Sequence, residues 1–208
     1  MIGVLGGTFD PVHHGHLRVA VEIREMLGLQ EMRLLPCRLP PHRASPQASA
    51  EFRLEMLKRA TQMEGALNID VRELQRDGPS YMVDTLESIR REIGTLALIL
   101  VLGADAFLNI TSWHRWQELF QYAHIVVLMR PGFLPKIPVE LERGAVFQQI
   151  ESPQAMRNVS CGLLYFHSVI QLDISSSMIR ELIRQGGNAR YLLPNDVLEF
   201  IKKENLYR

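Results

Sequence analysis

The sequence has little cysteine, no net charge and no long apolar run, and each of these absences excludes a class of protein. Cys37 and Cys161 are the only cysteines in 208 residues, too few for the disulfide framework of a small secreted domain. The 23 basic residues are matched by 23 acidic ones, so no global field would attract a nucleic acid or a membrane surface. No segment approaches the length of a membrane span, and no signal-peptide pattern is visible. We therefore expect a cytoplasmic protein with no nucleic-acid or membrane partner, either a monomer or a homo-oligomer.

Short apolar segments alternate with segments of helical periodicity along the whole chain. Its length and its 47% hydrophobic content suit a single compact domain, which we assign to residues 1–208. The alternation predicts an α/β fold, a Rossmann-like doubly wound parallel sheet with helices on both faces. Strands are expected at residues 2–5, 32–35, 67–71, 96–102, 125–129, 163–166 and 169–172. Helices are expected at residues 16–27, 52–60, 82–92, 115–122, 176–185 and 195–204. We also expect an extended segment at 36–43, a mobile loop at 44–49 and a surface excursion of uncertain structure at 133–158.

A glycine turn with three histidines follows the first apolar segment. The run from Gly6 to His16 reads Gly-Gly-Thr-Phe-Asp-Pro-Val-His-His-Gly-His. A strand, a glycine turn and a helix start together aim backbone N–H groups and the positive helix end at phosphate. His13 and His16 are three residues apart, so they project from the same side and can both donate hydrogen bonds to phosphate oxygens, whereas His14 points elsewhere. The predicted phosphate site consists of Gly7, Thr8, Phe9, His13, Gly15 and His16, with Thr8 and Phe9 acting through their backbone.

A second polar cluster opens the helix expected at 176–185. Ser175, Ser176 and Ser177 bring hydroxyl and N–H groups to the helix start, and Arg180 lies one turn after Ser176 on the same face. Such a helix end can hold a pyrophosphate. An ordinary N-cap followed by a solvent-facing arginine is the structural alternative, which is favoured less once the cluster is paired with the glycine turn.

The two clusters resemble, in the same order, the two signatures of the nucleotidylyltransferase superfamily. Its first signature is a glycine turn followed by His/Thr-x-Gly-His, and its second, Ile-Ser-Ser-Thr-x-Ile-Arg, resembles residues 174–180. Within that superfamily the chain resembles the bacterial nicotinate mononucleotide adenylyltransferases from Gly6 to Arg208. The resemblance implies an enzyme of NAD biosynthesis that joins ATP and nicotinate mononucleotide, giving nicotinate adenine dinucleotide and pyrophosphate. It makes His13, His16 and Arg180 the catalytic residues.

The resemblance also implies binding residues elsewhere in the chain. Gly103 and Asp105 match a Gly-x-Asp after the central strand, where Asp105 would bind ribose hydroxyls or, alternatively, only cap the next helix. Trp113 would face the pyridine ring, with Trp116 left to packing. Arg130 is assigned to ATP, and Cys37, Arg43, Tyr81 and Met82 complete the acceptor site. The family usually has Asn where Cys37 stands and Thr where Met82 stands, so each departure removes one side-chain hydrogen bond near the mononucleotide.

A metal held directly by the histidines is not expected, because no cysteine or paired carboxylate stands at ligand spacing. Mg²⁺ is expected instead, bound mainly through the phosphates of ATP and water. Two alternatives are a phosphopantetheine adenylyltransferase, which shares both signatures, and a non-catalytic nucleotide-binding regulator with the same fold. The chain length, the tryptophan region and residues 78–82 favour the nicotinate enzymes over the first alternative. The presence of both His16 and Arg180 argues against the second.

Overall fold

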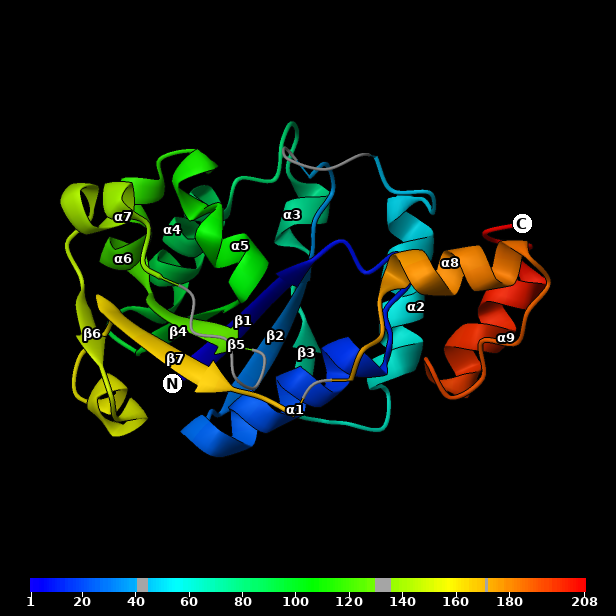
Figure 1. Cartoon of the computed structure of the whole chain (residues 1–208), viewed down its shortest axis with the longest axis horizontal. Helices are drawn as coiled ribbons and strands as arrows, with labels where there is room; N and C mark the ends of the chain where they lie inside the picture. Colours follow the sequence, from blue (N-terminus) through cyan, green and yellow to red (C-terminus); the bar gives the residue numbers. More distant parts are fainter. Residues whose placement is uncertain (41–44, 130–135, 171) are drawn as a thin grey trace.

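A seven-stranded parallel sheet forms the centre of the molecule, as the alternation predicts. The computed structural model describes residues 1–40, 45–129, 136–170 and 172–208. The strand order is β3-β2-β1-β4-β5-β7-β6, and every neighbouring pair is parallel (Figure 1). The strands are β1 (Ile2–Gly7), β2 (Glu31–Pro36), β3 (Leu67–Ile69), β4 (Leu98–Gly103), β5 (His124–Met129), β6 (Gln148–Ile150) and β7 (Leu163–Ser168). The order reverses between β1 and β4, so their carboxyl ends mark the switch point where open α/β sheets bind ligands.

Helices cover both faces of the sheet. The α-helices are α1 (His14–Leu27), α2 (Ala50–Thr61), α3 (Arg72–Gln75), α4 (Met82–Ile93), α5 (Ala104–Leu108), α6 (Leu119–Tyr122), α7 (Val139–Gly144), α8 (Ser176–Arg184) and α9 (Asn195–Lys203). The 3₁₀ turns are η1 (Ile110–Ser112), η2 (Trp116–Glu118) and η3 (Pro153–Arg157). Figure 1 places α2, α8 and α9 together at one end of the molecule, and α6 and α7 at the other.

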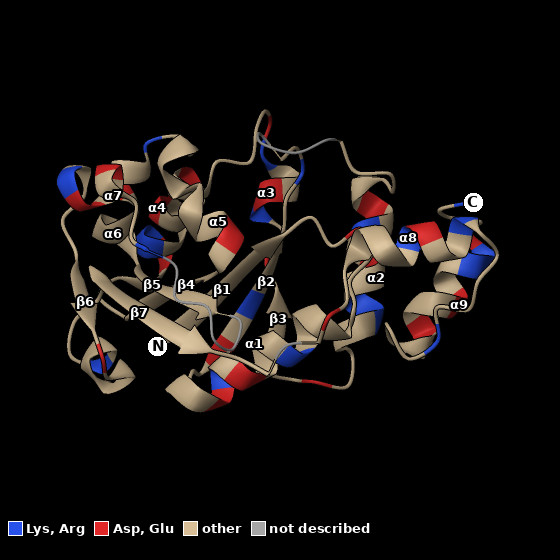
Figure 2. Cartoon of the chain, viewed as in Figure 1, with Lys and Arg blue, Asp and Glu red and all other residues tan. Residues whose placement is uncertain are grey.

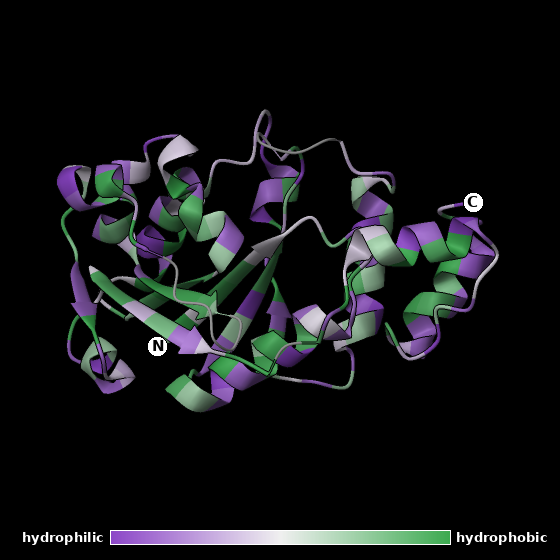
Figure 3. Ribbon diagram, viewed as in Figure 1, coloured by the Kyte–Doolittle hydropathy of each residue, from purple (hydrophilic) through white to green (hydrophobic). Residues whose placement is uncertain are grey.

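The strands bury side chains on both faces, which produces two separate cores. Ile99 and Val101 of β4 pack in the cluster that contains α1, α2, α8 and α9, whereas Leu98 and Leu100 pack in the cluster that contains α4, α5 and α6. Each residue from 98 to 102 is at most 6% exposed. Because burying one such side chain contributes about 1.5–3 kcal/mol, this uniformly apolar strand has a strong preference for the centre of the sheet. Figure 3 shows the strands mostly green and the helices banded in purple and green, as amphipathic helices should be.

Glycines end the helices where the sequence predicts. Gly28 follows α1 in the left-handed conformation, with φ 64°, and its N–H donates to the last turn. Gly186 follows α8 with φ 72°, and the N–H of Gly187 returns to the carbonyl of Leu182 over 2.8 Å. At the other end of α8, the Ser175 hydroxyl accepts a hydrogen bond from the N–H of Met178. These local signals fix where α8 begins and ends.

Two sequence-based predictions are wrong: the strand at 169–172, and the single helix at 115–122, where Arg115 has φ 50° and the 3₁₀ turn η2 precedes the short helix α6. Residues 169, 170 and 172 belong to no strand, and residue 171 lies outside the described residues. Ile170 is 66% exposed, so its apolar character does not reflect burial, and its N–H donates to the carboxylate of Glu22. The excursion predicted at 133–158 contains α7, β6 and η3 within its described part. Because β6 pairs only with β7 at the edge of the sheet, its residues Gln148 and Gln149 are exposed and show no apolar alternation.

Charged residues of both signs are interspersed over the helices, while the strands other than β2 carry almost none (Figure 2). Within the described residues, no helix combines the length and apolar composition needed to span a bilayer. The single-domain prediction for 1–208 remains a prediction.

The buried histidine at the start of β5 predicts acid sensitivity. Burial lowers the pKa of His124 below 6.5, helped by nearby Arg90, and its Nδ1 accepts the N–H of Leu163 over 3.1 Å. Around and below pH 6.5 this histidine is protonated more in the unfolded chain than in the folded chain, so stability falls as the pH drops below 6.5. We expect the free energy of unfolding to fall by up to about 1.4 kcal/mol per pH unit for this histidine in urea titrations between pH 7 and 5.

The variant His124→Asn isolates this contribution, because the amide oxygen can still accept the Leu163 N–H but does not titrate. It should be less stable than the parent at pH 7 and approach the parent at pH 5. Ile125→Val, which alters the neighbouring buried residue, should lose similar stability at both pH values. Parallel pH curves for His124→Asn and the parent would contradict the assignment.

Candidate active site

The glycine turn joins the carboxyl end of β1 to α1. A Cβ at Gly7 would lie 3.0 Å from the ring of Phe9, closer than side chains normally approach. Phe9 has φ 51° and is 1% exposed, so its side chain is part of the core and only its backbone can face a ligand. A Cβ at Gly15 would likewise meet the ring of His13 at 3.0 Å. Larger residues at either glycine would displace the rings that shape the turn.

His13 and His16 lie on the same side of the start of α1, as their spacing predicts. Their ring centroids are 3.7 Å apart, and Phe9 packs edge-on against His16. The backbone N–H of His13 donates to Nδ1 of His16 over 3.3 Å, so a neutral His16 carries its proton on Nε2. Burial, with a smaller contribution from His14, lowers the pKa of His13 to about 4. At neutral pH, His13 therefore acts as an uncharged hydrogen-bonding group.

The first turn of α8 docks onto the glycine turn. Ser176 Oγ donates to the carbonyl of Pro11 over 2.9 Å, and Arg180 Nη1 donates to the carbonyl of Asp10 over 2.6 Å. Both donors come from one face of α8, as their spacing of four residues predicts. In Figure 1 α8 lies beside the blue segment that leads into α1. The two polar clusters, 165 and more residues apart in the sequence, thus form one continuous surface.

The guanidinium of Arg180 is only partly used by the protein. Its Nη2 donates weakly to Ser177 Oγ over 3.4 Å, and its side chain is 20% exposed. Its Nε is buried and, in the described part of the chain, has no hydrogen-bond partner. A planar guanidinium whose N–H donors are not all used within the protein is suited to bind an anion.

Asp10, which sequence reasoning did not assign to the site, holds the turn together. It is 4% exposed, and its carboxylate accepts the N–H groups of Gln47 at 2.7 Å and Ala48 at 3.1 Å. It also accepts the hydroxyl of Tyr207 at 2.7 Å. These bonds anchor the 47–48 part of the segment that the sequence predicts as a mobile loop. No local pattern could reveal this role, because all three donors are distant in the sequence.

Arg53 is the second residue that sequence reasoning missed. It is 1% exposed, and its Nη1 donates to the carbonyls of Thr8 at 2.9 Å and Cys37 at 2.6 Å. It thereby ties the glycine turn to the segment after β2. A signal was present in the sequence: Arg53 lies three and four residues before Met56 and Leu57, on the apolar stripe of α2. An arginine on a buried face needs several acceptors.

Cys37 and Met82 adjoin the glycine turn, as the acceptor-site prediction requires. The N–H of Cys37 donates to the carbonyl of Gly7 over 3.0 Å. A Cβ on Gly6 would meet the terminal methyl of Met82 at 2.9 Å, so the start of α4 lies against the end of β1. Both residues therefore face the switch point of the sheet.

Tyr81 and Trp113 lie in the same neighbourhood. Tyr81 stacks on His114, with ring centroids 4.3 Å apart, and both Tyr81 and Trp113 pack on the core that contains α4. Trp116 packs on the same core, and a Cβ on Gly144 would meet its ring at 2.4 Å, so Trp116 has the packing role that the sequence predicts.

The remaining predicted residues fall in two groups. Gly103 ends β4 and is the N-cap of α5, and Asp105 is an exposed residue in the first turn of α5. Asp105 is thus not the N-cap residue but lies in the first turn, where a carboxylate stabilises the helix start, and its role toward the ribose stays a prediction. Arg43 and Arg130 lie outside the described residues.

Metal-binding groups do not gather at the site. Across residues 1–40, 45–129, 136–170 and 172–208, no three His, Cys, Asp or Glu side chains are placed to hold an ion. The carboxylate of Asp10, at the centre of the turn, is already occupied by three donors. The described residues therefore do not fit a metal bound by the protein itself.

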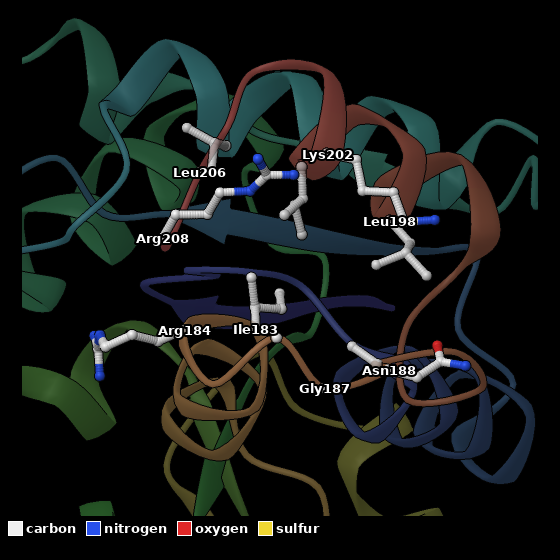
Figure 4. A pocket seen from close by; sticks show the side chains of 11 residues that line it. Ile183, Arg184, Gly187, Asn188, Leu198, Lys202, Leu206 and Arg208 are labelled. Carbon is white, nitrogen blue, oxygen red and sulfur yellow. The ribbon is translucent and has the colours of Figure 1, made fainter.

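A separate cavity of about 410 Å³ lies between the end of α8, residues 186–189 and α9 (Figure 4). No residue predicted for the site lines it. Of its cationic residues, Arg184 pairs with Glu181 and Lys202 pairs with Glu199. Arg208 is its third cationic residue, and the position of the cavity sets it apart from the glycine turn.

Known proteins match the chain over its whole length. The cytidylyltransferase-like family model matches residues 4–182. A probable nicotinate-nucleotide adenylyltransferase of Methylococcus capsulatus is 50% identical over 208 residues, covering 100% of this chain and 99% of that protein. The probable nicotinate-nucleotide adenylyltransferase of Pseudomonas putida strain GB-1 is 48% identical, covering 100% and 94%.

Solved structures share the fold. The Plasmodium falciparum nicotinic acid mononucleotide adenylyltransferase complexed with NaAD has a TM-score of 0.74 at 18% identity, covering 99% of this chain and 96% of that one. The same enzyme complexed with APC has a TM-score of 0.72 at 19% identity, with the same coverage. The full-length identity of 50% shows that the chain belongs to the nicotinate-nucleotide adenylyltransferase family and is a nucleotidyltransferase.

Proposed function

We propose that the chain transfers the adenylyl group of ATP to nicotinate mononucleotide at the surface formed by the glycine turn and α8. An oxygen of the mononucleotide 5′-phosphate attacks the α-phosphorus of ATP. The bond from that phosphorus to the bridging oxygen breaks, and pyrophosphate leaves with the electron pair. The products are nicotinate adenine dinucleotide and pyrophosphate.

The docking of α8 on the glycine turn carries this proposal. It brings His16 and Arg180 to the same stretch of backbone, Arg180 through its 2.6 Å bond to Asp10. Nε2 of His16 would donate to the α-phosphate, while His13 and the backbone of Thr8 and Phe9 would position phosphates. Ser176 and Arg180 would hold the β- and γ-phosphates, exchanging their carbonyl acceptors for phosphate oxygens.

The attacking phosphate is already an anion, so the reaction requires no strong base. Catalysis then rests on alignment and on donors placed where charge develops. The neutral imidazole of His13 suits that role, because it can donate a hydrogen bond without requiring a change of protonation. ATP would enter as its magnesium complex, with the ion held by phosphates and water, because the described residues offer no cage.

The start of α4 is proposed to select the pyridine nucleotide. No Lys or Arg occurs between Asp77 and Ile89, so main-chain N–H groups around Tyr81 to Val83 at the helix N-terminus would bind the nicotinate carboxylate. The fold brings Arg115 to this turn, but its Nη1 contacts Asp84 at 3.1 Å and its other nitrogens contact Glu118. The charge of Arg115 is therefore already neutralised. Trp113 would face the pyridine ring, and Asp105 the ribose of ATP.

The decisive measurement is pyrophosphate release from ATP with nicotinate mononucleotide, nicotinamide mononucleotide and phosphopantetheine as acceptors. Main-chain donors match a carboxylate and repel the NH₂ of an amide. We expect kcat/KM to favour the acid over the amide at least about tenfold, which one or two unmatched hydrogen bonds can supply.

Equal values for the acid and the amide, or a preference for the amide, would contradict the role of the α4 N–H groups. Preferential use of phosphopantetheine would replace the proposed acceptor. Pyrophosphate release with none of the three acceptors would leave the non-catalytic regulator as the better account.

A further inference from the structure

The segment after α9 returns to the glycine turn. Tyr207 donates its hydroxyl to Asp10 Oδ1 over 2.7 Å across 197 residues of sequence, and its side chain is largely buried. Burial, followed by the charge of Asp10, raises the pKa of Tyr207. The hydroxyl consequently keeps its proton at neutral pH and remains a donor.

Asp10 lies between Tyr207 and Arg180. Its backbone carbonyl accepts Arg180 Nη1 at 2.6 Å, but its carboxylate Oδ2 is 3.9 Å from the same nitrogen. A charge-assisted hydrogen bond between such groups is normally about 2.7–2.9 Å long. The ion pair between Asp10 and Arg180 is therefore loose, because the carboxylate is satisfied by the Tyr207 hydroxyl and by two backbone N–H groups.

We propose that Tyr207 is a positioning residue for ATP, which satisfies Asp10 and so keeps the Arg180 guanidinium available for the phosphates. This step rests on the proposed function of Arg180. Without the hydroxyl, Oδ1 of Asp10 would retain only the Ala48 N–H. A buried carboxylate that loses a donor draws in the nearest available cation.

Arg180 is that cation. Among the described residues, Arg53 is the other guanidinium beside Asp10 and Tyr207, and it already donates to four carbonyls, those of Thr8, Cys37, Arg38 and Ala48. A tighter pair with Asp10 would withdraw Arg180 from ATP. It would leave the acceptor side, near Cys37 and Met82, unchanged.

The test is Tyr207→Phe, which removes the hydroxyl and keeps the ring. We expect the Kd for ATP, measured by titration calorimetry without acceptor, to rise about tenfold. The KM for ATP should rise by a similar factor. The KM for nicotinate mononucleotide should stay within about twofold, because Tyr207 packs in the core that contains α9, whereas Tyr81, Met82 and Trp113 pack on the core that contains α4. A variant that only lost stability would not raise the KM for ATP while leaving the KM for nicotinate mononucleotide unchanged.

Two control variants separate the hydroxyl from general effects. Tyr191→Phe removes a hydroxyl from a tyrosine that is 83% exposed and should leave the ATP affinity unchanged. Phe200→Leu destabilises α9, where Phe200 packs on Phe52, without touching Asp10, and should lower the Tm without shifting the Kd for ATP.

Folded Tyr207→Phe with an unchanged Kd for ATP would overturn the role of Tyr207. An equal rise in the Kd for ATP in Phe200→Leu would do the same. If the parent protein binds ATP but transfers nothing to nicotinate mononucleotide, the proposed function fails, and the calorimetric comparison still decides the role of Tyr207.

Discussion

Replacing His16 with alanine is expected to lower kcat by a factor of about 10² to 10³, the usual cost of removing one donor to developing charge. The expectation follows from the hydrogen bond of the His13 N–H to Nδ1 of His16, which in a neutral ring leaves the proton on Nε2, the atom proposed to donate to the α-phosphate. Steady-state pyrophosphate release, with circular dichroism to verify folding, measures the effect.

Two further substitutions at position 16 separate the two ring nitrogens. Asparagine places its polar atoms near Nδ1, and glutamine can place an amide N–H near Nε2. Glutamine should therefore recover part of the lost rate, and asparagine should be as slow as alanine. His14→Ala alters the adjacent ring, to which no role in phosphate binding is assigned, and should leave kcat within about threefold of the parent. Near-parental turnover by folded His16→Ala would remove His16 from the mechanism.

Replacing Arg180 with alanine is expected to lower kcat/KM for ATP by about ten- to a hundredfold, the worth of one charge-assisted hydrogen bond or slightly more. The KM for nicotinate mononucleotide should change much less, because α8 is proposed to hold only the leaving pyrophosphate. Arg180→Lys should recover only part of the loss, because a point charge cannot reproduce the planar fork. Initial rates with each substrate varied at saturating levels of the other test both statements.

Arg184→Ala is the matched control. It lies one turn further along α8, is exposed and pairs with Glu181, so its removal should not affect ATP use. An unchanged dependence on ATP in both Arg180 variants would make Arg180 a structural residue that only braces the Asp10 carbonyl.

Local patterns predicted the sheet and most of the helices because they report burial. The uniformly apolar segment that forms β4 requires two covered faces, and the structure supplies both. The stripe of Ala20, Ile23 and Leu27 in α1 requires one covered face, which packs in the core that contains α1 and α2. The strand predicted at 169–172 is wrong because exposed apolar residues such as Ile170 produce the same pattern as buried ones. The edge strand β6 escaped prediction because three residues with two exposed glutamines carry no periodic signal.

The candidate site likewise has features that the local sequence encodes and features that it does not. Both signatures are local, so the sequence could place His13, His16, Ser176 and Arg180 on helix starts, and the structure confirms that the two starts meet. What the sequence could not show is the set of contacts between distant segments. The bonds of Asp10 to Tyr207 and of Arg53 to the Thr8 carbonyl depend on how α2 and α9 pack, which no local pattern encodes.

The bond between Asp10 and Tyr207 also bears on the order in which the protein is made. During synthesis, the glycine turn leaves the ribosome before α8 and α9, and the Tyr207 hydroxyl that completes Asp10 emerges 197 residues after Asp10. At about 5–20 residues per second, the turn waits roughly 10–40 seconds for that partner. A nascent chain that ends at α8 can contain both histidines and Arg180, yet Asp10 would still face that arginine with one donor missing. If Tyr207 positions Arg180 as proposed, nucleotide binding with full affinity requires a chain that extends at least to Tyr207.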